Sequence, residues 1–344
     1  MKAAKLFLGS ITGGSAIFVG QRIYQDGRFD LNNFGAIRLG RAALSVSLIG
    51  VDYKRTLFSS STPKHETQEY EEAKSKVNQR SANRLLDLCN KNGGVFIKVG
   101  QHIAALGYLF PDEYVNTLKV LHATAPRMNL EDVYAVIKED TGQDAKDLFK
   151  EFEDEPLGTA SIAQVHKAKL KETGEEVAVK VQHRYVKKHS LIDIKTCYFL
   201  VKAVKYAFPQ FEFMWLAEQM KKNLTDELNF LQEAQNTEKV SKLLTHLPGV
   251  RVPKIHWNLS SERILVMEFC KGGKIDDVEY LKKHNIDFEG VSKKVDEMYA
   301  SMIYKHGYVH CDPHPGNVLV HKNNEGVDEV ILLDHGLYTV SLSS

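Results

Sequence analysis

The feature that most constrains this chain is the loop that runs from Tyr308 to Val320. It contains Asp312 and Asn317, five positions apart, on a stretch stiffened by two prolines and a glycine and followed by apolar, strand-forming residues. A second acid, Asp334, follows another apolar run and stands two residues before a glycine. Two such loops in this order are typical of phosphotransferases that hold a base and a metal over a phosphate.

The chemistry of phosphoryl transfer explains this spacing. The protein must mainly position groups and neutralise charge, so its polar residues sit on rigid turns and converge on Mg²⁺. On this interpretation Asp312 is the catalytic base, while Asn317 and Asp334 are metal ligands. Two alternatives remain: a polar turn with no chemistry, or a metal hydrolase whose ligands are His310, Asp312 and His314, which leaves Asn317 and Asp334 without a role.

Length and composition indicate a globular protein. The 344 residues carry 45 basic and 44 acidic side chains, for a net charge of +1, which gives no reason to expect a nucleic acid as partner. Four cysteines, Cys89, Cys197, Cys270 and Cys311, are scattered without a Cys-x-x-Cys pair. We therefore expect reduced thiols and neither a disulfide framework nor a structural zinc site.

The first 25 residues differ from the rest of the chain. They contain no acid, and residues 6–20 are apolar or small. This pattern favours a mitochondrial address or a short membrane anchor, with a secretory signal and an ordinary buried helix as alternatives. A second acid-free apolar stretch, residues 36–51, is expected either to lie on a membrane surface or to pack on the body of the protein.

The patterns along the chain predict five consecutive segments. Residues 58–76 are polar and form the best candidate for a linker. A β-rich portion follows a helical one, which predicts an α+β fold. The expected segments are residues 1–25 as a targeting or anchor segment, 26–76 as an extension and linker, 77–154 as a helical extension, 155–270 as a small lobe and 271–344 as a partial large lobe.

Helical periodicity dominates the extension. It runs over residues 69–109 and is broken at Asn92-Gly93-Gly94, so a new helix is expected from Val95 to Leu106. In that helix Lys98 and Gln101 share one face. Either both are presented toward a site, or Lys98 reaches out to solvent and Gln101 is simply exposed. Further short helices are expected from Pro111 to His122 and after Asn129.

The small lobe is expected to open with a hairpin. Residues 162–170 and 176–182 pair around Thr173-Gly174, and the segment before them covers the phosphates of a nucleotide. Phosphate loops commonly contain several glycines, whereas this one has Gly158 and otherwise small residues that still allow close approach. The residues expected to bind nucleotide here are Leu157, Gly158, Thr159, Ala160, Ser161, Ile162, Ala163, Gln164 and Val165.

Lys180 ends a Val-Ala-x-Lys stretch on the second strand, which is the placement of a catalytic lysine that holds the α- and β-phosphates. Such a lysine needs a carboxylate from a helix. Residues 211–238 predict one long helix, and it offers both Glu227 and Glu233. Spacing alone does not separate the two.

The remaining elements complete the two lobes. Strands are expected over residues 252–257 and 264–269, and the second of them leads into a hinge that includes Glu268 and binds the adenine edge. Helices are expected over residues 278–283 and 291–306, the latter beneath the catalytic loop.

Taken together, these motifs resemble the UbiB, or aarF-domain-containing, family of atypical protein-kinase-like proteins, and its mitochondrial kinase 1 type in particular. The resemblance runs from about Asn92 to Leu337. The matching motifs are Lys-x-Gly-Gln at Lys98–Gln101, the Ala-rich loop at Thr159–Gln164, the lysine Lys180, the catalytic loop at His310–Asn317 and Asp-x-Gly at Asp334–Gly336.

The resemblance implies a protein-kinase-like two-lobed fold with an N-terminal helical extension. It implies ATP and Mg²⁺ as cofactors, a pair between Lys180 and Glu233, and a regulatory role for Lys98, Gln101 and Glu227, because the Lys-x-Gly-Gln helix folds over the place where a protein substrate would dock. The resemblance also implies activity as an ATPase or as a kinase of small molecules or lipids. The implied setting is mitochondrial lipid and coenzyme Q homeostasis. A lipid or quinone-related partner and membrane association are therefore expected.

Two departures from the family pattern are visible. The family's Glu-x-Asp motif is Glu227-Leu228-Asn229 here, which removes one carboxylate. Kinase large lobes also have several helices after the Asp-x-Gly loop, so the large lobe is expected to be truncated at its C-terminus and the chain to bind nucleotide weakly or to aggregate. Both departures favour an alternative function, a catalytically inactive nucleotide-binding scaffold.

Overall fold

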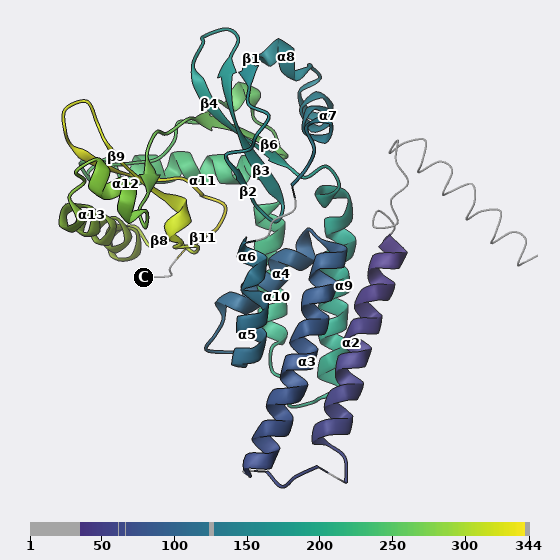
Figure 1. Ribbon diagram of the computed structural model, residues 1–344. Coiled ribbons are helices and arrows are strands. Elements are labelled where there is room, and N and C mark those ends of the chain that lie inside the picture. The colour runs from purple at the N-terminus through teal and green to yellow at the C-terminus, as the bar shows by residue number, and fades with distance from the viewer. Residues whose placement is uncertain (1–34, 61, 66, 124–126, 341–344) are drawn as a thin grey trace, which may run out of the picture.

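The computed structural model describes residues 35–60, 62–65, 67–123 and 127–340, so the expected targeting segment, residues 1–25, lies outside the described residues. Figure 1 shows three parts: a bundle of long helices, a small lobe built on a sheet above it, and a large lobe beside the small one. The chain forms the expected α+β two-lobed fold with a helical extension.

The helical bundle places segments far apart in sequence side by side (Figure 1). Its long helices are α2 (Gly35–Leu57), α3 (Gln68–Asn92), α4 (Val95–Ala105), α9 (Val186–Ala207) and α10 (Met214–Glu227). Two short helices, α5 (Asp112–Leu118) and α6 (Val120–Ala123), pack beside α3 and α4. Fully buried apolar side chains, including Ala42, Leu118 and Leu121, form its core, because each helix has one apolar face.

The acid-free stretch at residues 36–51 belongs to α2, which packs on α3 and α9. Arg38 of α2 donates to the Asp193 carboxylate of α9 at 2.9 Å, and both side chains are buried. Within the described part of the chain, no helix combines the length and apolar character needed to cross a bilayer.

The turn between α2 and α3 is shorter than expected. The hydroxyl of Thr67 accepts a hydrogen bond from the amide of Tyr70 and so caps α3, which begins at Gln68. The expectation of a linker through residue 76 was therefore wrong for residues 68–76. The predicted break after α3 is present: Gly93 has φ of +65°, where glycine is favoured.

An antiparallel sheet forms the small lobe. Its strands follow the order β1-β3-β4-β6, and β2 pairs with β3. The expected hairpin is present, with Val165 opposite Lys180. The strands are β1 (Phe149–Phe152), β2 (Gly158–Thr159), β3 (Ala163–Leu170), β4 (Glu176–Gln182) and β6 (Ile264–Glu268). Helices α7 (Leu130–Thr141), capped by Asn129 as expected, and α8 (Ala145–Leu148) pack on one face of this sheet (Figure 1).

The large lobe is built on a second sheet, in the order β5-β10-β9-β7, and on a two-stranded pair, β8 with β11. The strands are β5 (Val250–Arg251), β7 (Gly273–Lys274), β8 (Tyr308–His310), β9 (Val318–Lys322), β10 (Asp328–Leu332) and β11 (Tyr338–Val340). The helices of the large lobe are α12 (Val278–Lys283) and α13 (Phe288–Ala300), with one π turn, η3 (Ser301–Lys305), and a 3₁₀ turn, η4 (Pro315–Asn317). Helix α11 (Phe230–Leu243) lies between the lobes, since Phe230 packs in the small-lobe core and Val240 in the large-lobe core. The 3₁₀ turn η2 (Trp257–Leu259) packs on β6 of the small lobe.

Two expectations about elements were wrong, and two elements were not predicted. The helix predicted over residues 211–238 is two helices, α10 and α11, because the amide of Phe230 is bonded to the carbonyl of Glu262 instead of continuing the helix. The strand predicted over residues 252–257 is reduced to a bridge between Ile255 and Met267. Helix α9 and strand β1 were not predicted at all.

Candidate active site

Lys180 of β4 lies at the centre of the site. Its Nζ donates to both carboxylate oxygens of Glu233, on α11, at 2.7 and 2.8 Å, and it lies 3.4 Å from Oδ2 of Asp334. The ring of Phe230 is 5.1 Å away and covers the lysine from one side. A strand, a helix and a loop that are distant in sequence thus bring three ionisable groups together.

Burial and charge act against each other in this cluster. Burial alone would raise the pKa of Asp334, but the Lys180 ammonium and the Gly336 amide, 2.9 Å from Oδ1, hold that pKa well below its usual range. Burial raises the pKa of Glu233 to about 7 although Lys180 opposes it. The carboxylates of Asp334 and Glu233 outweigh burial at Lys180 and raise its pKa. Lys180 therefore stays charged and Asp334 stays ionised at neutral pH.

The catalytic loop is fastened to the Asp334 loop by hydrogen bonds. A ring nitrogen of His310 lies 2.6 Å from the carbonyl oxygen of Asp334, and the amide of Leu333 donates to the carbonyl of Asn317 at 2.9 Å. Pairing of β8 with β11 joins the two loops again on the far side. Asp312 and Asn317 are consequently held in fixed relation to Asp334.

Asp312 is exposed, and the side-chain amide of Asn317 lies 3.4 Å from its carbonyl oxygen. Together with Asp334 they offer carboxylate and amide oxygens, the hard donors that Mg²⁺ prefers. The donor set therefore fits the expected ion. Among the described residues, no three His, Cys, Asp or Glu side chains are grouped in a way that would hold a metal by themselves.

The hydrolase alternative requires His310 as a metal ligand. Both of its ring nitrogens are already in hydrogen bonds, one with the carbonyl of Asp334 and the other with the amide of Asp312. In His314 one ring nitrogen, Nδ1, accepts from the amide of Gly316 at 3.0 Å. The histidines of this loop hold its shape, which argues against a histidine-ligated metal here.

The expected nucleotide loop divides into an exposed half and a buried half. Leu157, Gly158, Thr159 and Ala160 are exposed, and a Cβ added at Gly158 would meet open space. Ala160 donates its amide to the carbonyl of Ala163 at 2.7 Å, which closes a tight turn. Much of the main chain in the exposed half is already bonded within the protein: the amide of Leu157 donates to the carbonyl of Val165 at 2.7 Å, and the carbonyl of Ala160 lies 3.0 Å from a ring nitrogen of His183.

The buried half serves the scaffold. Ser161, Ile162, Ala163 and Gln164 are buried, and Val165 is partly so. The Gln164 side chain accepts from the amide of Met128 at 2.9 Å and donates to its carbonyl. Gln164 therefore ties the loop to the segment before α7, and its side chain is committed to protein groups.

The side chain of Glu268, expected at the hinge, is also bonded to another protein side chain. The carboxylate of Glu268 forms an ion pair with Arg251, whose other nitrogen contacts Glu329 at 3.3 Å. The amide of Glu268 donates to the carbonyl of Lys254 at 2.8 Å. The carbonyl oxygen of Glu268 lies 3.9 Å from the sulfur of Cys270. Because the carboxylate is bonded to Arg251, a role of Glu268 toward a nucleotide would fall to its main chain.

The Lys-x-Gly-Gln helix contributes a second ion pair. Lys98 of α4 lies 3.0 Å from Glu227 at the end of α10, and His102 lies 3.8 Å from the same carboxylate. Burial raises the pKa of Glu227, whereas Glu227 outweighs burial at Lys98 and raises its pKa, with Asp312 and Asp334 contributing. Lys98 is thus within electrostatic reach of the catalytic loop.

Gln101 does not share this position. Its side-chain amide donates to the carbonyl of Leu121 at 2.9 Å and so joins α4 to α6. The glycine of the motif, Gly100, is required by close packing. A Cβ there would lie 2.4 Å from the side chain of Leu121 and 3.1 Å from the sulfur of Cys89. The glycine lets α4 pack closely enough to present Lys98.

Asn229, the departure from the family motif, caps α11. Its side-chain oxygen accepts from the amide of Leu231 at 3.1 Å. Asparagine and aspartate cap helices equally well. The substitution therefore preserves the start of the helix that carries Glu233.

The sequence did not predict the residues that hold the Asp334 loop in place through its neighbour His335. Asn236 of α11 donates to the carbonyl of His335 at 2.9 Å and accepts from the hydroxyl of Tyr308 at 2.7 Å. His335 is fully buried and hydrogen-bonded to Tyr338 at 2.8 Å. The only signal in the sequence was that Asn236 stands three positions, almost one turn, after Glu233.

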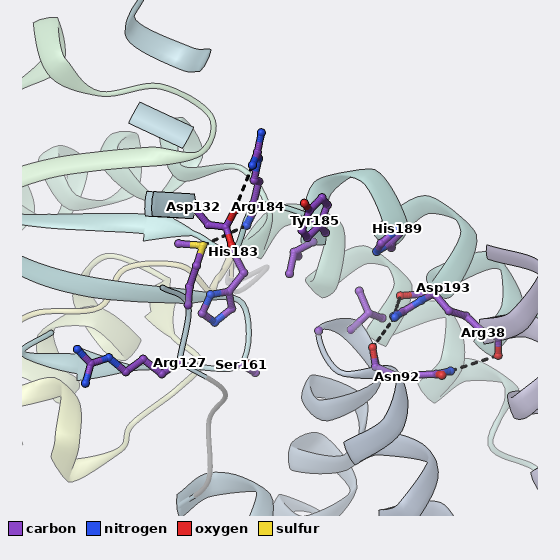
Figure 2. Close-up of a pocket in the computed structure, with 14 residues that line it drawn as sticks. Arg38, Asn92, Arg127, Asp132, Ser161, His183, Arg184, Tyr185, His189 and Asp193 are labelled. Atoms are coloured by element: carbon purple, nitrogen blue, oxygen red, sulfur yellow. Dashed lines mark hydrogen bonds and ion pairs between the residues drawn. The ribbon is translucent and has the colours of Figure 1, made fainter. Parts of the chain in front are cut away.

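A pocket of about 350 Å³ lies at the junction of the helical bundle with the small lobe. Figure 2 shows Arg38 and Asp193 on its bundle side and His183, Arg127 and Ser161 on its small-lobe side. Of the residues expected to bind nucleotide, Ser161 alone is part of its wall. The pocket is therefore separate from the cluster around Lys180.

Comparison with known proteins shows the family of this chain. The profile of the ABC1 atypical kinase-like domain matches residues 120–341, which include every element of the cluster. The chain belongs to the ABC1 atypical kinase-like family. It is 49% identical to mouse AarF domain-containing protein kinase 1 over 341 residues, 99% of this chain and 64% of the mouse protein. It is also 49% identical to the Drosophila melanogaster AarF domain-containing kinase 1 over 310 residues, 90% of this chain and 60% of that protein.

More distant relatives extend the family. The chain is 40% identical to the ABC1 family protein MCP2 homolog of Schizosaccharomyces pombe, over 88% of this chain and 54% of that protein. The solved complex of Rv3197 with erythromycin from Mycobacterium tuberculosis has a similar fold, with a TM-score of 0.53 and 25% identity, covering 78% of this chain and 67% of that one. The chain spans less than two thirds of the curated relatives described here.

Proposed function

We propose that this chain carries the nucleotide-binding and catalytic part of an ATP-dependent atypical kinase or ATPase. The observation that supports this most strongly is the single cluster of Lys180, Glu233 and Asp334, with the catalytic loop hydrogen-bonded to the backbone of Asp334. An ammonium paired with a helix carboxylate beside an ionised aspartate is the arrangement that phosphoryl transfer requires.

Each residue then has one task. Lys180, oriented by Glu233, binds the α- and β-phosphates, and Asp334 and Asn317 hold Mg²⁺. Mg²⁺ supplies charge neutralisation on the phosphate oxygens when it is bound. Asp312, exposed at the tip of the catalytic loop, accepts the proton of the attacking hydroxyl or water.

The acceptor is proposed to be water or a small molecule, and not a protein. The charge of Lys98 on helix α4 is coupled to those of Asp312 and Asp334. The family resemblance assigns this helix to the place where a protein substrate would dock. A lipid or quinone-related acceptor at a mitochondrial membrane is consistent with the family resemblance. This setting, like the activity, is proposed for the whole protein of which this chain spans a part.

A second candidate is a nucleotide-binding scaffold without turnover. The same Lys98 favours it, because a fixed cation close to Asp334 competes with a metal ion for the carboxylate. The two candidates share nucleotide binding and differ in phosphate release.

Both can be tested with Mg²⁺-dependent ATP binding and phosphate release, measured with and without vesicle lipids or quinone headgroups as acceptors. The enzyme predicts turnover that falls about 10²-fold or more in Asp334→Asn, because the metal loses a charged ligand. Asp296→Asn, an exposed acid on α13, is the matched control and should retain activity. Binding without turnover would support the scaffold, and no Mg²⁺-dependent binding would refute both candidates.

A further inference from the structure

Glu227 has two basic side chains beside it, and the proposed function involves only one of them. Nζ of Lys98 lies 3.0 Å from Oε2 of Glu227, and Nε2 of His102 lies 3.8 Å from Oε1. Lys98 and His102 are four residues apart on α4, so both project from one face of that helix toward the end of α10. Each carboxylate oxygen of Glu227 therefore has its own basic neighbour.

His102 is not bonded as the structural histidines of this chain are. His166 and His335 are fully buried, and both ring nitrogens of each have hydrogen-bond partners. In His102 the buried Nδ1 has no partner among the described residues, and Nε2 is too far from Glu227 for a hydrogen bond. A buried nitrogen without a partner is unfavourable, so packing alone does not explain a histidine here.

The charges around His102 keep it neutral while Lys98 is in place. Burial, the Lys98 ammonium and His122 of α6 lower the pKa of His102 to about 4. Helices α3, α5 and α9 also pack on α4, and none of the charged side chains that the structure describes on them contributes to this pKa. Glu227 is the one acid that the structure describes within 4.0 Å of the ring. At neutral pH the charged pair is therefore Lys98 with Glu227.

Lys98 is attracted by other acids besides Glu227. Asp312 and Asp334 contribute to its raised pKa, and the phosphates of a bound nucleotide would add negative charge on the same side. The lysine stem is flexible, and its side chain is 21% exposed. If Lys98 turned toward the phosphates, Glu227, whose side chain is 9% exposed, would lose its counter-charge. A buried carboxylate without a counter-charge is strongly unfavourable.

We propose that His102 is a positioning residue that takes the place of Lys98 at Glu227 when Lys98 leaves. Nε2 and Oε1 then approach to hydrogen-bond distance and share one proton taken up from solvent, which replaces the charge lost with Lys98. Helices α4 and α10 stay joined, and Lys98 is free to contact a nucleotide. Only this last step rests on the proposed function, so the exchange at Glu227 and the proposed function can fail separately.

Nuclear magnetic resonance titration of the His102 ring tests the exchange directly. The full chain is labelled with ¹³C-histidine, and His102→Gln identifies the signal among 14 histidines. Lys98→Met leaves Glu227 without its cation, so the proton affinity of His102 should rise about tenfold or more. Lys91→Met, in an exposed pair with Asp87 at 2.7 Å, is the matched control and should leave His102 unchanged.

A second variant separates exchange from the simple loss of repulsion. Adding Glu227→Gln to Lys98→Met removes the carboxylate as well, so most of the rise in proton affinity should disappear. An equal rise in the double variant would overturn the proposal, because loss of the Lys98 charge alone would then explain it. No rise in Lys98→Met would overturn it as well.

The wild-type chain tests the step that involves nucleotide, without any substitution. Saturation with Mg²⁺ and a non-hydrolysable ATP analogue should raise the proton affinity of His102, as Lys98→Met does. Bound nucleotide with an unchanged His102 titration would contradict the release of Lys98. Absence of nucleotide binding would instead refute the proposed function, and the variants of Lys98 and Glu227 would still decide the exchange.

Discussion

Two lysine–glutamate pairs lie near Asp334, and they are supported in different ways. Lys180 and Glu233 join β4 to α11 within the kinase-like lobes, and their side chains are 13 and 4% exposed. Lys98 and Glu227 join α4 to α10 within the helical extension and are 21 and 9% exposed. The first pair contacts Asp334 directly, whereas the second acts on it through its charge.

The two pairs are positioned by different parts of the fold. The Lys180 pair depends on sheet register and on the start of α11, so it is fixed by the lobes themselves. The Lys98 pair depends on how closely α4 packs on its neighbours, at Gly100. We therefore expect changes at the first pair to abolish function and changes at the second to adjust it.

Lys180→Met should have the largest effect. Loss of the ammonium removes the phosphate ligand and leaves the buried Glu233 carboxylate without its partner, so ATP turnover should fall about 10²-fold or more. Lys150→Met, at an exposed position of β1, is a control in the same sheet and should retain turnover. Steady-state phosphate release measures the difference. Equal losses of turnover in both variants would show that the effect comes from damage to the sheet and not from the site.

Glu233→Gln should change the pH dependence of stability. Burial raises the pKa of Glu233 to about 7 in the folded chain, above its value of 4.5 when unfolded, so the folded state holds the proton more tightly. Its contribution to stability is fully present below pH 4.5 and is lost as the pH rises through the folded pKa of about 7. Urea unfolding from pH 5 to 8 should show this decline in the wild type and a flatter profile in Glu233→Gln. Parallel profiles would contradict it.

Gly100→Ala should destabilise the helical side of the site. The new methyl group would collide with Leu121 and Cys89, and overpacking of this kind costs about 1–3 kcal/mol. Gly40→Ala in α2 is the matched control, because a Cβ there meets nothing within 4 Å and should be neutral or stabilising by about 0.5–1 kcal/mol. Thermal unfolding of both variants would show whether α4 is as tightly packed as described.

Lys98→Met should leave the Lys180 pair intact and change the affinity of the site for Mg²⁺. Removal of a cation near Asp334 should raise the affinity for Mg²⁺ in the presence of ATP, by roughly two- to fivefold. Titration with Mg²⁺ measures this change. A loss of nucleotide binding as large as that of Lys180→Met would show that the two pairs do not differ in the way described.

Asn229→Asp should have the smallest effect, within about 0.5 kcal/mol of the wild-type free energy of unfolding, because aspartate caps α11 equally well. Asn229→Ala removes the cap and should cost about 1 kcal/mol. Chemical denaturation separates the two. A large change in turnover for Asn229→Asp would instead assign this position a role in the site.

Local patterns predicted the parts of the fold that local physics determines. The hairpin, the catalytic loop and the Asp-x-Gly loop follow from turn residues and strand periodicity within a few positions of each other. The break between α3 and α4 follows likewise from Gly93. The ion pair at Lys180 was expected only once the family resemblance had chosen between Glu227 and Glu233.

The parts that sequence did not predict depend on distant contacts. Helix α9 begins without a side-chain cap at Tyr185, so no start signal marks it. The division between α10 and α11 is made by Phe230, whose amide bonds to Glu262, a residue far along the chain. The commitment of Gln164 to Met128 is of the same kind. Such hydrogen bonds leave no periodic trace in a sequence.

The most direct test of the site is electron paramagnetic resonance of Mn²⁺ in place of Mg²⁺, with ATP. If Lys180, Asp312, Asn317 and Asp334 surround one metal–nucleotide complex, the wild-type chain should bind Mn²⁺ only with ATP. Asp334→Asn should then keep nucleotide but lose the bound metal signal. Mn²⁺ and ATP bound undiminished in Asp334→Asn would contradict the account.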